Sequence, residues 1–174
     1  QRFRRVDVAL SLDPSLPLAR GAEDDVVQLL FYLMTNALEA LQESGGTAPR
    51  IDLATRRAGE AIELSVADNG CGMDEATRAR AFEPFFTTKP LGTGTGLGLS
   101  TTYGIVRQCG GSIALESEPG NGTRVEISLP ASTTSRPSVA PRIVAPISQG
   151  VRLDTSILLV EDDASVRRLL AIML

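Results

Sequence analysis

The sequence of 174 residues contains no histidine and no tryptophan, and it has only two cysteines. Without histidine the chain cannot by itself build a Ser-His-Asp triad, a Cys-His pair or an imidazole zinc site. Cys71 and Cys109 form no CxxC motif, which favours a reducing compartment over a disulfide framework. Any histidine chemistry in which this chain takes part must therefore use a histidine from elsewhere.

Long apolar runs and a surplus of positive charge are also lacking. The most apolar stretch, Leu29–Met34, is far too short to span a bilayer, and no signal peptide is visible. We therefore expect a cytoplasmic location, which leaves open a membrane anchor in the parent protein. The net charge of −4 argues against a nucleic-acid partner. The chain starts without Met and ends inside an apolar segment, so we expect both ends to be cuts in a longer protein.

The length and the hydrophobic content of 43% predict one globular domain plus a remainder. Apolar and polar periodicity, with Gly and Pro at the breaks, predicts an α/β fold. We expect a two-layer α/β sandwich, with a mixed sheet that is largely antiparallel and helices on one face. The expected strands are 6–12, 51–57, 61–67, 112–117 and 123–129, and the expected helices are 24–44, 74–81 and 99–109. In the first helix, the apolar positions at helical spacing are Val26, Leu30, Leu33, Ala37 and Leu41.

The composition changes after the last expected strand. Residues 131–150 hold three Pro, many Ser and Thr, and few charges, which is typical of a flexible linker. A short apolar strand and an acidic cluster follow. We expect a first domain over 1–130, a linker over 131–154, and the truncated start of a second domain over 155–174.

The first helix carries a second, polar stripe in addition to its apolar one. An Asn on such a stripe can offer a neutral oxygen to Mg²⁺ beside phosphates, although a polar helix face is more often simply solvated. The stripe consists of Gln28, Tyr32, Asn36, Glu39 and Glu43.

Two glycine-containing segments have the character of ligand loops. Asp68 ends a strand and precedes Gly70 and Gly72. It can accept a hydrogen bond from an exocyclic amine such as that of adenine, although an ordinary turn has the same composition. Residues 92–99, Gly-Thr-Gly-Thr-Gly-Leu-Gly-Leu, open a helix. Main-chain N–H groups at a helix start attract phosphate, but the segment matches neither a Walker A nor a Rossmann loop.

The order of these segments closely resembles the boxes of sensor histidine kinases over residues 6–130. The N box is matched at Asn36 and the G1 box at Asp68-x-Gly70-x-Gly72. The lid box is matched by Phe-Glu-Pro-Phe-Phe-Thr-Thr-Lys at 82–89. The G2 box is matched by Gly-x-Gly-Leu-Gly-Leu at 94–99, and the final Gly-Thr box by Gly-Asn-Gly-Thr at 120–123. The resemblance implies the Bergerat ATP-binding fold of gyrase, histidine kinases and MutL.

The resemblance also implies roles for the residues on the adenine side. Asp68 would bind the adenine amino group, while Gly70 and Gly72 would shape its pocket. Thr123 would support Asp68 and a water beside the adenine.

On the phosphate side, Asn36 would hold Mg²⁺ against the triphosphate. Residues 82–98 would form a mobile lid, in which three phenylalanines pack against the body or a partner helix. Lys89, the only lysine beside sixteen arginines, would neutralise phosphate charge, or else be a solvated lid residue. Glu39 would have a supporting role in catalysis with Asn36 and Lys89. The main-chain groups that would cradle the phosphates are those of Gly94, Gly96, Leu97 and Gly98.

One position departs from the family pattern. Many members carry a second Asn one turn before Asn36, where this chain has Tyr32. Gyrase-type and MutL-type ATPases carry a Glu there that activates water, which Tyr32 cannot do. The resemblance therefore implies γ-phosphoryl transfer from Mg-ATP to a histidine on the dimerisation helices of the parent protein, itself a homodimer. A non-catalytic nucleotide-sensing module and an ATP hydrolase are the alternatives.

The tail resembles the first strand and acidic cluster of a response-regulator receiver domain. The matching residues are Ile-Leu-Leu-Val-Glu-Asp-Asp at 157–163, in which Glu161 and Asp162 would help to bind Mg²⁺. An unrelated strand with a charged exit is the alternative. The resemblance implies a hybrid histidine kinase with a receiver domain as a partner, and it leaves the oligomeric state of the isolated chain open, including a monomer.

Overall fold

A computed structural model describes residues 6–46, 48–90 and 94–132 of the chain. Five strands form one sheet in the order β1-β2-β3-β5-β4. β1 runs parallel to β2, and every other neighbouring pair is antiparallel. The expected mixed sheet is therefore confirmed. The strands are β1 Asp7–Leu12, β2 Arg50–Ala58, β3 Ala61–Asp68, β4 Ser112–Ser117 and β5 Thr123–Pro130.

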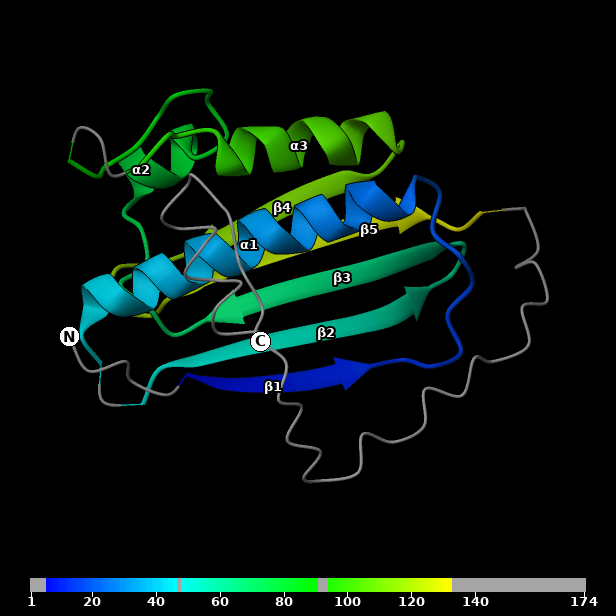
Figure 1. Cartoon of the computed structure of the whole chain (residues 1–174), viewed down its shortest axis with the longest axis horizontal. Coiled ribbons are helices and arrows are strands. Elements are labelled where there is room, and N and C mark those ends of the chain that lie inside the picture. The colour runs from blue at the N-terminus through cyan, green and yellow to red at the C-terminus, as the bar shows by residue number, and fades with distance from the viewer. Residues whose placement is uncertain (1–5, 47, 91–93, 133–174) are drawn as a thin grey trace, which may run out of the picture. The chain divides into compact units, whose positions relative to one another are not determined.

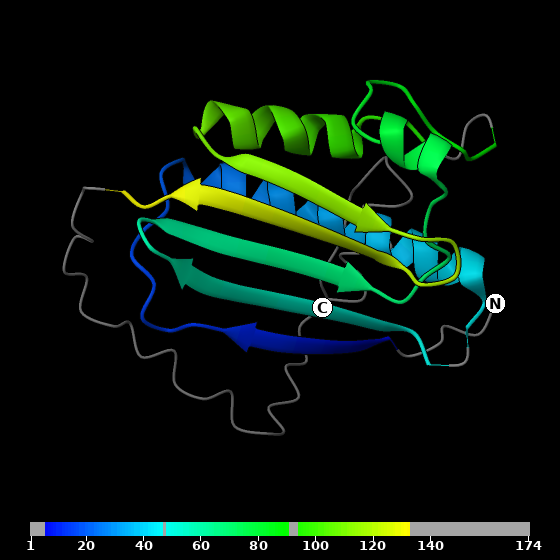
Figure 2. The same cartoon turned by 180° about the vertical axis from the view of Figure 1, so that it is seen from behind.

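Three helices complete the described part of the chain. α1 spans Glu23–Ser44, α2 spans Glu75–Arg80 and α3 spans Gly98–Gln108. α1 and α3 lie over the same face of the sheet (Figure 1), while the opposite face carries no helix (Figure 2). This arrangement confirms the two-layer α/β sandwich. No helix among the described residues is both long and apolar enough to cross a membrane.

The helix ends follow from local sequence. α1 stops at Gly45, whose φ of 61° places it in the left-handed region that glycine adopts without strain. At the start of α2, the Asp74 side chain accepts a hydrogen bond from the Thr77 N–H at 2.8 Å. The observed helix bounds lie within one residue of the expected ranges for these two ends.

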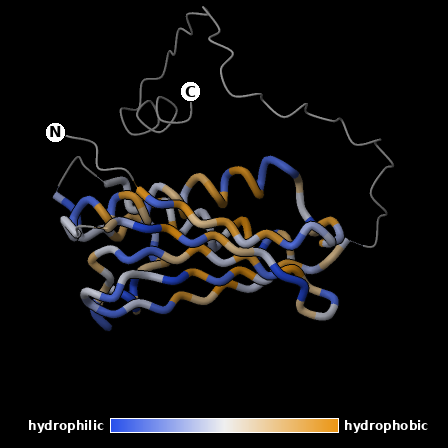
Figure 3. The backbone as a smooth tube through the Cα atoms, turned by 90° about the horizontal axis from the view of Figure 1, so that it is seen from below, coloured by the Kyte–Doolittle hydropathy of each residue, from blue (hydrophilic) through white to orange (hydrophobic). Residues whose placement is uncertain are grey.

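The core lies between α1, α3 and the covered face of the sheet. Hydrophobic and hydrophilic residues alternate along the strands (Figure 3), so that Ile62, Leu64 and Val66 of β3 are buried. Of the expected apolar stripe of α1, Leu33, Ala37 and Leu41 are buried and Leu30 packs against the core. Val26 is only half-buried, and the buried Leu29 is not among the expected positions. A helix repeats every 3.6 residues, and several registers therefore fit the same apolar positions. The buried residues of α1 are Leu29, Leu33, Ala37 and Leu41.

The uncovered face of the sheet is polar. Arg56 of β2 and Glu63 of β3 are register partners and form an ion pair on this face. Arg124 and Glu126 of β5 form a second pair, with 3.8 Å between nitrogen and oxygen. The first pair joins two strands and the second lies along one strand, and each contributes at most a little stability because it is exposed to solvent.

We expect Leu29→Ala to lower the free energy of unfolding by about 2–5 kcal/mol, because Leu29 is 0% exposed and its loss leaves a cavity under α1. Val27→Ala, two positions earlier on the same helix, is the matched control. Val27 is 60% exposed, and we expect a change below about 0.5 kcal/mol. Urea unfolding monitored by circular dichroism measures both values. Equal effects of the two substitutions would contradict the register of α1 described above.

Candidate nucleotide-binding site

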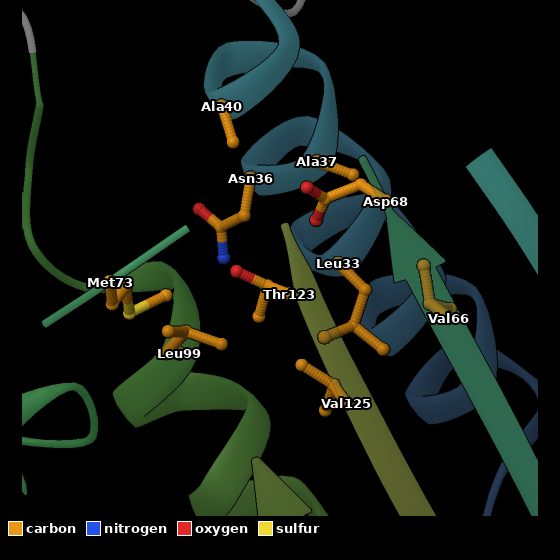
Figure 4. A pocket seen from close by; sticks show the side chains of 10 residues that line it. All are labelled: Leu33, Asn36, Ala37, Ala40, Val66, Asp68, Met73, Leu99, Thr123 and Val125. Atoms are coloured by element: carbon orange, nitrogen blue, oxygen red, sulfur yellow. The ribbon is translucent and has the colours of Figure 1, made fainter. Parts of the chain in front are cut away.

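A cleft opens where the second half of α1, the start of α3 and the ends of β3 and β5 meet. Its outer part encloses about 1100 Å³, including the open mouth, and reaches from Asn36 to the lid residues Thr87, Thr88 and Lys89. This volume is sufficient for a nucleotide. Its inner part is mostly apolar and is shown in Figure 4. The inner part is lined by Leu33, Asn36, Ala37, Ala40, Val66, Asp68, Met73, Leu99, Thr123 and Val125.

Asp68 is the acidic group of the inner pocket. One of its carboxylate oxygens accepts a hydrogen bond from the Gly70 N–H at 2.8 Å, and the main-chain N–H of Thr123 also donates to this carboxylate. Burial raises the pKa of Asp68 above its usual 3.8, and this effect outweighs the lowering by the two N–H groups. The pocket therefore holds a carboxylate that is fixed in place and can still accept a hydrogen bond from a ligand.

The main chain beside Asp68 is held by contacts that only glycine permits. A Cβ at Gly70 would lie 2.7 Å from the main-chain carbon of Ala40 in α1. Gly72 has a φ of 66°, and a Cβ there would collide with the carbonyl of Glu118. The two glycines expected to shape the pocket thus lie where the loop touches α1 and the turn between β4 and β5.

Asn36 lies on the cleft side of α1, opposite Asp68 (Figure 4). Its Nδ2 is one of two buried side-chain polar atoms without a hydrogen-bond partner in the described part of the chain. Such an atom is costly unless a ligand satisfies it. The side chain therefore fits a ligand that presents both an acceptor for Nδ2 and a cation for Oδ1.

Lys89 and Glu39 form an ion pair that joins the lid segment to α1. Their side chains are 24% and 29% exposed, so the pair is shielded more than an ordinary surface pair. Within the lid segment, the main chain at Lys89 is held by a hydrogen bond, because the Lys89 N–H donates to Thr87 Oγ1 at 3.2 Å. The alternative of a solvated Lys89 is wrong for this structure, and Glu39 is occupied by the lysine rather than directed at the cleft.

The two ends of the lid are held together by main-chain contacts. The Phe85 N–H donates to the Gly96 carbonyl at 2.9 Å, and a Cβ at Gly96 would lie 2.5 Å from the carbonyl carbon of Phe85. A Cβ at Gly94 would lie 2.9 Å from Thr87 Oγ1. Phe85 is 75% exposed in this chain, so it does not pack against the body here, and its packing against a partner helix stays a prediction.

The other two phenylalanines of the lid segment do make contacts within the chain. The ring of Phe82 lies 5.6 Å from that of Tyr103, and the guanidinium of Arg80 lies 4.2 Å above the ring of Phe86. These contacts attach the base of the lid to α3 and α2, leaving the outward side of Phe85 to face solvent.

α3 begins at Gly98, directly after Leu97, and points its N-terminus toward Asn36. A Cβ at Gly98 would lie 3.4 Å from the Asn36 amide and 3.6 Å from the Tyr32 ring. No acidic residue occupies the first turn of α3, whereas α1 has three there. An N-terminus without a carboxylate leaves its N–H groups and dipole available to an anion.

One residue beside the site, Ser117, was not identified from the sequence. Ser117, at the end of β4, is buried and donates to the Gly122 carbonyl at 2.9 Å. A Cβ at Gly122 would collide with the Asp68 carbonyl. The Gly-Asn-Gly-Thr motif pointed to Gly122, but no sequence signal distinguishes Ser117 from the other serines.

The acidic residues of the tail, Glu161 and Asp162, lie outside the described residues, as do Gly92 and Thr93 of the glycine-rich segment. Among the described residues, no group of three His, Cys, Asp or Glu side chains could hold a metal ion.

We expect Asp68→Asn to stabilise the ligand-free chain relative to the parent chain at pH 8, and this gain to shrink toward pH 4. The raised pKa of Asp68 means that the folded state binds the proton more tightly than the unfolded state. The stability of the parent chain therefore rises as the pH falls through the raised pKa toward 3.8. Urea unfolding across this pH range measures the difference.

Asp52→Asn is the control with the opposite sign. The pKa of Asp52 is lowered, chiefly by its hydrogen bond from Arg50, so the stability that Asp52 contributes is lost as the pH falls through the lowered pKa. The disadvantage of Asp52→Asn should therefore be greatest at high pH. A loss of stability at pH 8 in both variants would mean that Asp68 is not held in a desolvating pocket.

The sequence and the fold of this chain resemble those of known proteins. The family model of "Histidine kinase-, DNA gyrase B-, and HSP90-like ATPase" matches residues 21–133. The two-component sensor PprA of Pseudomonas aeruginosa is 40% identical over 133 residues, which is 74% of this chain and 14% of PprA. The chain thus spans about a seventh of that relative's length.

Two solved structures share the fold. ShkA, crystallised at full length in complex with AMPPNP, superimposes with a TM-score of 0.63 at 26% identity, over 75% of this chain and 27% of ShkA. The catalytic domain of the histidine kinase ThkA superimposes with a TM-score of 0.61 at 28% identity, over 72% of this chain and 80% of that domain. PprA is a two-component sensor and ThkA is a histidine kinase, and this chain belongs to the histidine kinase, DNA gyrase B and HSP90-like ATPase family.

Proposed function

We propose that this chain contains the ATP-binding catalytic domain of a two-component sensor histidine kinase. The reaction is transfer of the γ-phosphoryl group of ATP to a histidine on the dimerisation helices of the parent protein, since the sequence itself has no histidine. The observation that carries the proposal is the convergence on one cleft of Asn36, Asp68, Lys89 and Thr123 from four separate segments.

On the adenine side, Asp68 accepts a hydrogen bond from the 6-amino group, and Thr123 supports it. The apolar wall made by Val66, Met73 and Val125 gives the base a dry surface. Gly70 and Gly72 contribute by letting the main chain approach α1 and the turn between β4 and β5. This half of the cleft binds and orients the nucleotide but takes no part in bond breaking.

On the phosphate side, main-chain N–H groups at Gly94, Gly96, Leu97 and Gly98 cradle the phosphate oxygens. The unpaired amide of Asn36 fits this role: its Oδ1 is the neutral oxygen that would hold Mg²⁺, a cation that neutralises phosphate charge when bound. Phosphoryl transfer depends mainly on positioning and charge neutralisation, and these residues supply both.

Lys89 and Glu39 form an ion pair that we expect to separate when ATP binds. In the nucleotide-free chain each neutralises the other. We propose that Lys89 turns to the γ-phosphate when ATP binds, and that Glu39 is then left to face the phosphate region in a supporting role. Tyr32 occupies the position from which gyrase-type ATPases activate water, and this favours transfer over hydrolysis.

Two parts of the parent protein are the expected partners of the catalytic domain. The domain boundaries that we propose are 1–130 for the catalytic domain, 131–154 for a linker and 155–174 for the start of a receiver domain. Glu161 and Asp162 would contribute to the Mg²⁺ site of that receiver. The dimerisation helices and a receiver domain are the expected protein partners, and the parent protein acts as a homodimer in the cytoplasm.

We expect the 174-residue chain to bind Mg-ATP and to show no incorporation of γ-³²P into itself. Addition of a separate dimerisation domain with its acceptor histidine should restore labelling, on that domain only. Calorimetry and autoradiography measure the two results. Labelling of the isolated chain would overturn the proposal. Affinity unaffected by Mg²⁺, together with no labelling of an added histidine domain, would instead support the nucleotide-sensing module.

We expect Lys89→Met to weaken ATP binding by about tenfold, the worth of one charge-assisted hydrogen bond, with a smaller effect on ADP. Glu39→Gln should bind ATP as tightly as the parent chain or more tightly, because it removes the group that competes for Lys89. Arg107→Met, on the exposed side of α3, controls for the loss of a positive charge. An equal loss in Glu39→Gln and Lys89→Met would show that Glu39 itself binds the nucleotide.

A further inference from the structure

Two hydroxyl groups face each other at the adenine end of the cleft. Ser117 ends β4, Thr123 begins β5, and the two residues are register partners. Their oxygens are 3.0 Å apart. Ser117 is 7% exposed and does not line the cleft, whereas Thr123 lines both its inner and outer parts. The serine is thus placed behind the threonine, on the side away from any ligand.

The partners of Ser117 decide which hydroxyl donates to the other. A serine hydroxyl has one proton and two acceptor positions. Ser117 Oγ lies 2.9 Å from the Gly122 carbonyl, which can only accept, and 2.8 Å from the Met73 N–H, which can only donate. The serine proton therefore goes to Gly122. The contact between Ser117 and Thr123 is then a hydrogen bond only if Thr123 donates.

This arrangement fixes what Thr123 presents to the cleft. Since its proton points inward to Ser117, only the lone pairs of its oxygen remain for a ligand. The neighbouring Asp68 is an acceptor as well, because its carboxylate already takes N–H groups from Gly70 and Thr123. Figure 4 shows Thr123 and Asp68 directed into the same pocket. These two side chains together form an edge made only of acceptors.

We propose that Ser117 is a positioning residue that holds the Thr123 hydroxyl as an acceptor and thereby makes the site prefer a 6-aminopurine to a 6-oxopurine. The proposal rests on the proposed function, because it assumes that the purine of ATP lies against Asp68. It adds a residue that does not touch the ligand but determines which ligand is accepted.

The physical basis is the pairing of donors with acceptors at the sixth position of the purine. A 6-amino group has two N–H donors, one for each of the two acceptors. A 6-oxo group would place a third acceptor against them, so that neither Asp68 nor Thr123 could form a hydrogen bond with it, which is strongly unfavourable in a buried site. Without Ser117, the Thr123 hydroxyl can rotate and donate to the 6-oxo oxygen.

The test compares ATP with inosine triphosphate, which carries oxygen in place of the amino group, by calorimetry on the 174-residue chain. We expect the parent chain to prefer ATP by about 100-fold or more. Ser117→Ala should reduce this preference by about tenfold, mostly through tighter binding of inosine triphosphate. Ser117→Thr keeps the hydroxyl and should keep the preference. Ser112→Ala, at the exposed far end of β4, should change neither affinity.

A second variant covers the possibility that Ser117→Ala does not fold, which thermal melting would reveal. Thr123→Val replaces threonine with a residue of the same shape that lacks the hydroxyl, and it should also lower the preference for ATP by about tenfold. The double variant should then match Thr123→Val alone, because Ser117 acts only through Thr123.

The outcomes separate the inference from the proposed function. Loss of affinity for both nucleotides by the same factor in Ser117→Ala, or an unchanged preference in Thr123→Val, would overturn the role of Ser117 while leaving ATP binding in place. Failure of the parent chain to bind either nucleotide would overturn both.

Discussion

The site depends on how closely the main chain of residues 68–72 approaches its neighbours. On one side it touches α1, where a side chain at Gly70 would meet the main chain of Ala40. On the other side it touches the turn between β4 and β5, where a Cβ at Gly122 would collide with the main-chain carbonyl of Asp68. The Cys71 N–H donates to the Ala40 carbonyl at 3.2 Å. Because this loop is held from both sides, the carboxylate that ends β3 has one position relative to α1.

The contact of residues 68–72 with α1 brings together a partly buried carboxylate and groups that can bind an anion. The carboxylate of Asp68 is desolvated by burial, which raises its pKa, while the proposed phosphate side has main-chain N–H groups and one lysine. The single charge of Lys89 is matched by Glu39. If Lys89 binds the triphosphate as proposed, it must exchange its ion pair with Glu39 for one with a phosphate, so that binding would not rest on an unpaired positive charge.

Much of this could be predicted from the sequence because the decisive signals are local. Helical and strand periodicity gave the elements, and the glycines marked the loops. Three features could not be predicted. Lys89 and Glu39 are 50 positions apart, and nothing local pairs them. The role of Ser117 depends on the register of β4 against β5. Phe85 was expected to pack against the body or a partner helix, and nothing in the local sequence indicated its φ of 66° or its 75% exposure in this chain.

The position of α1 links the stability of the fold to the geometry of the cleft. Leu33 and Ala37 of the buried stripe flank Asn36 and also line the inner pocket, so the core and the site share residues. Each residue turns a helix by about 100°. A shift of register by one residue would therefore rotate the Asn36 amide away from the cleft and separate Glu39 from Lys89. Core packing beneath α1 is thus a condition for nucleotide binding, because the buried leucines fix the direction in which the polar stripe faces.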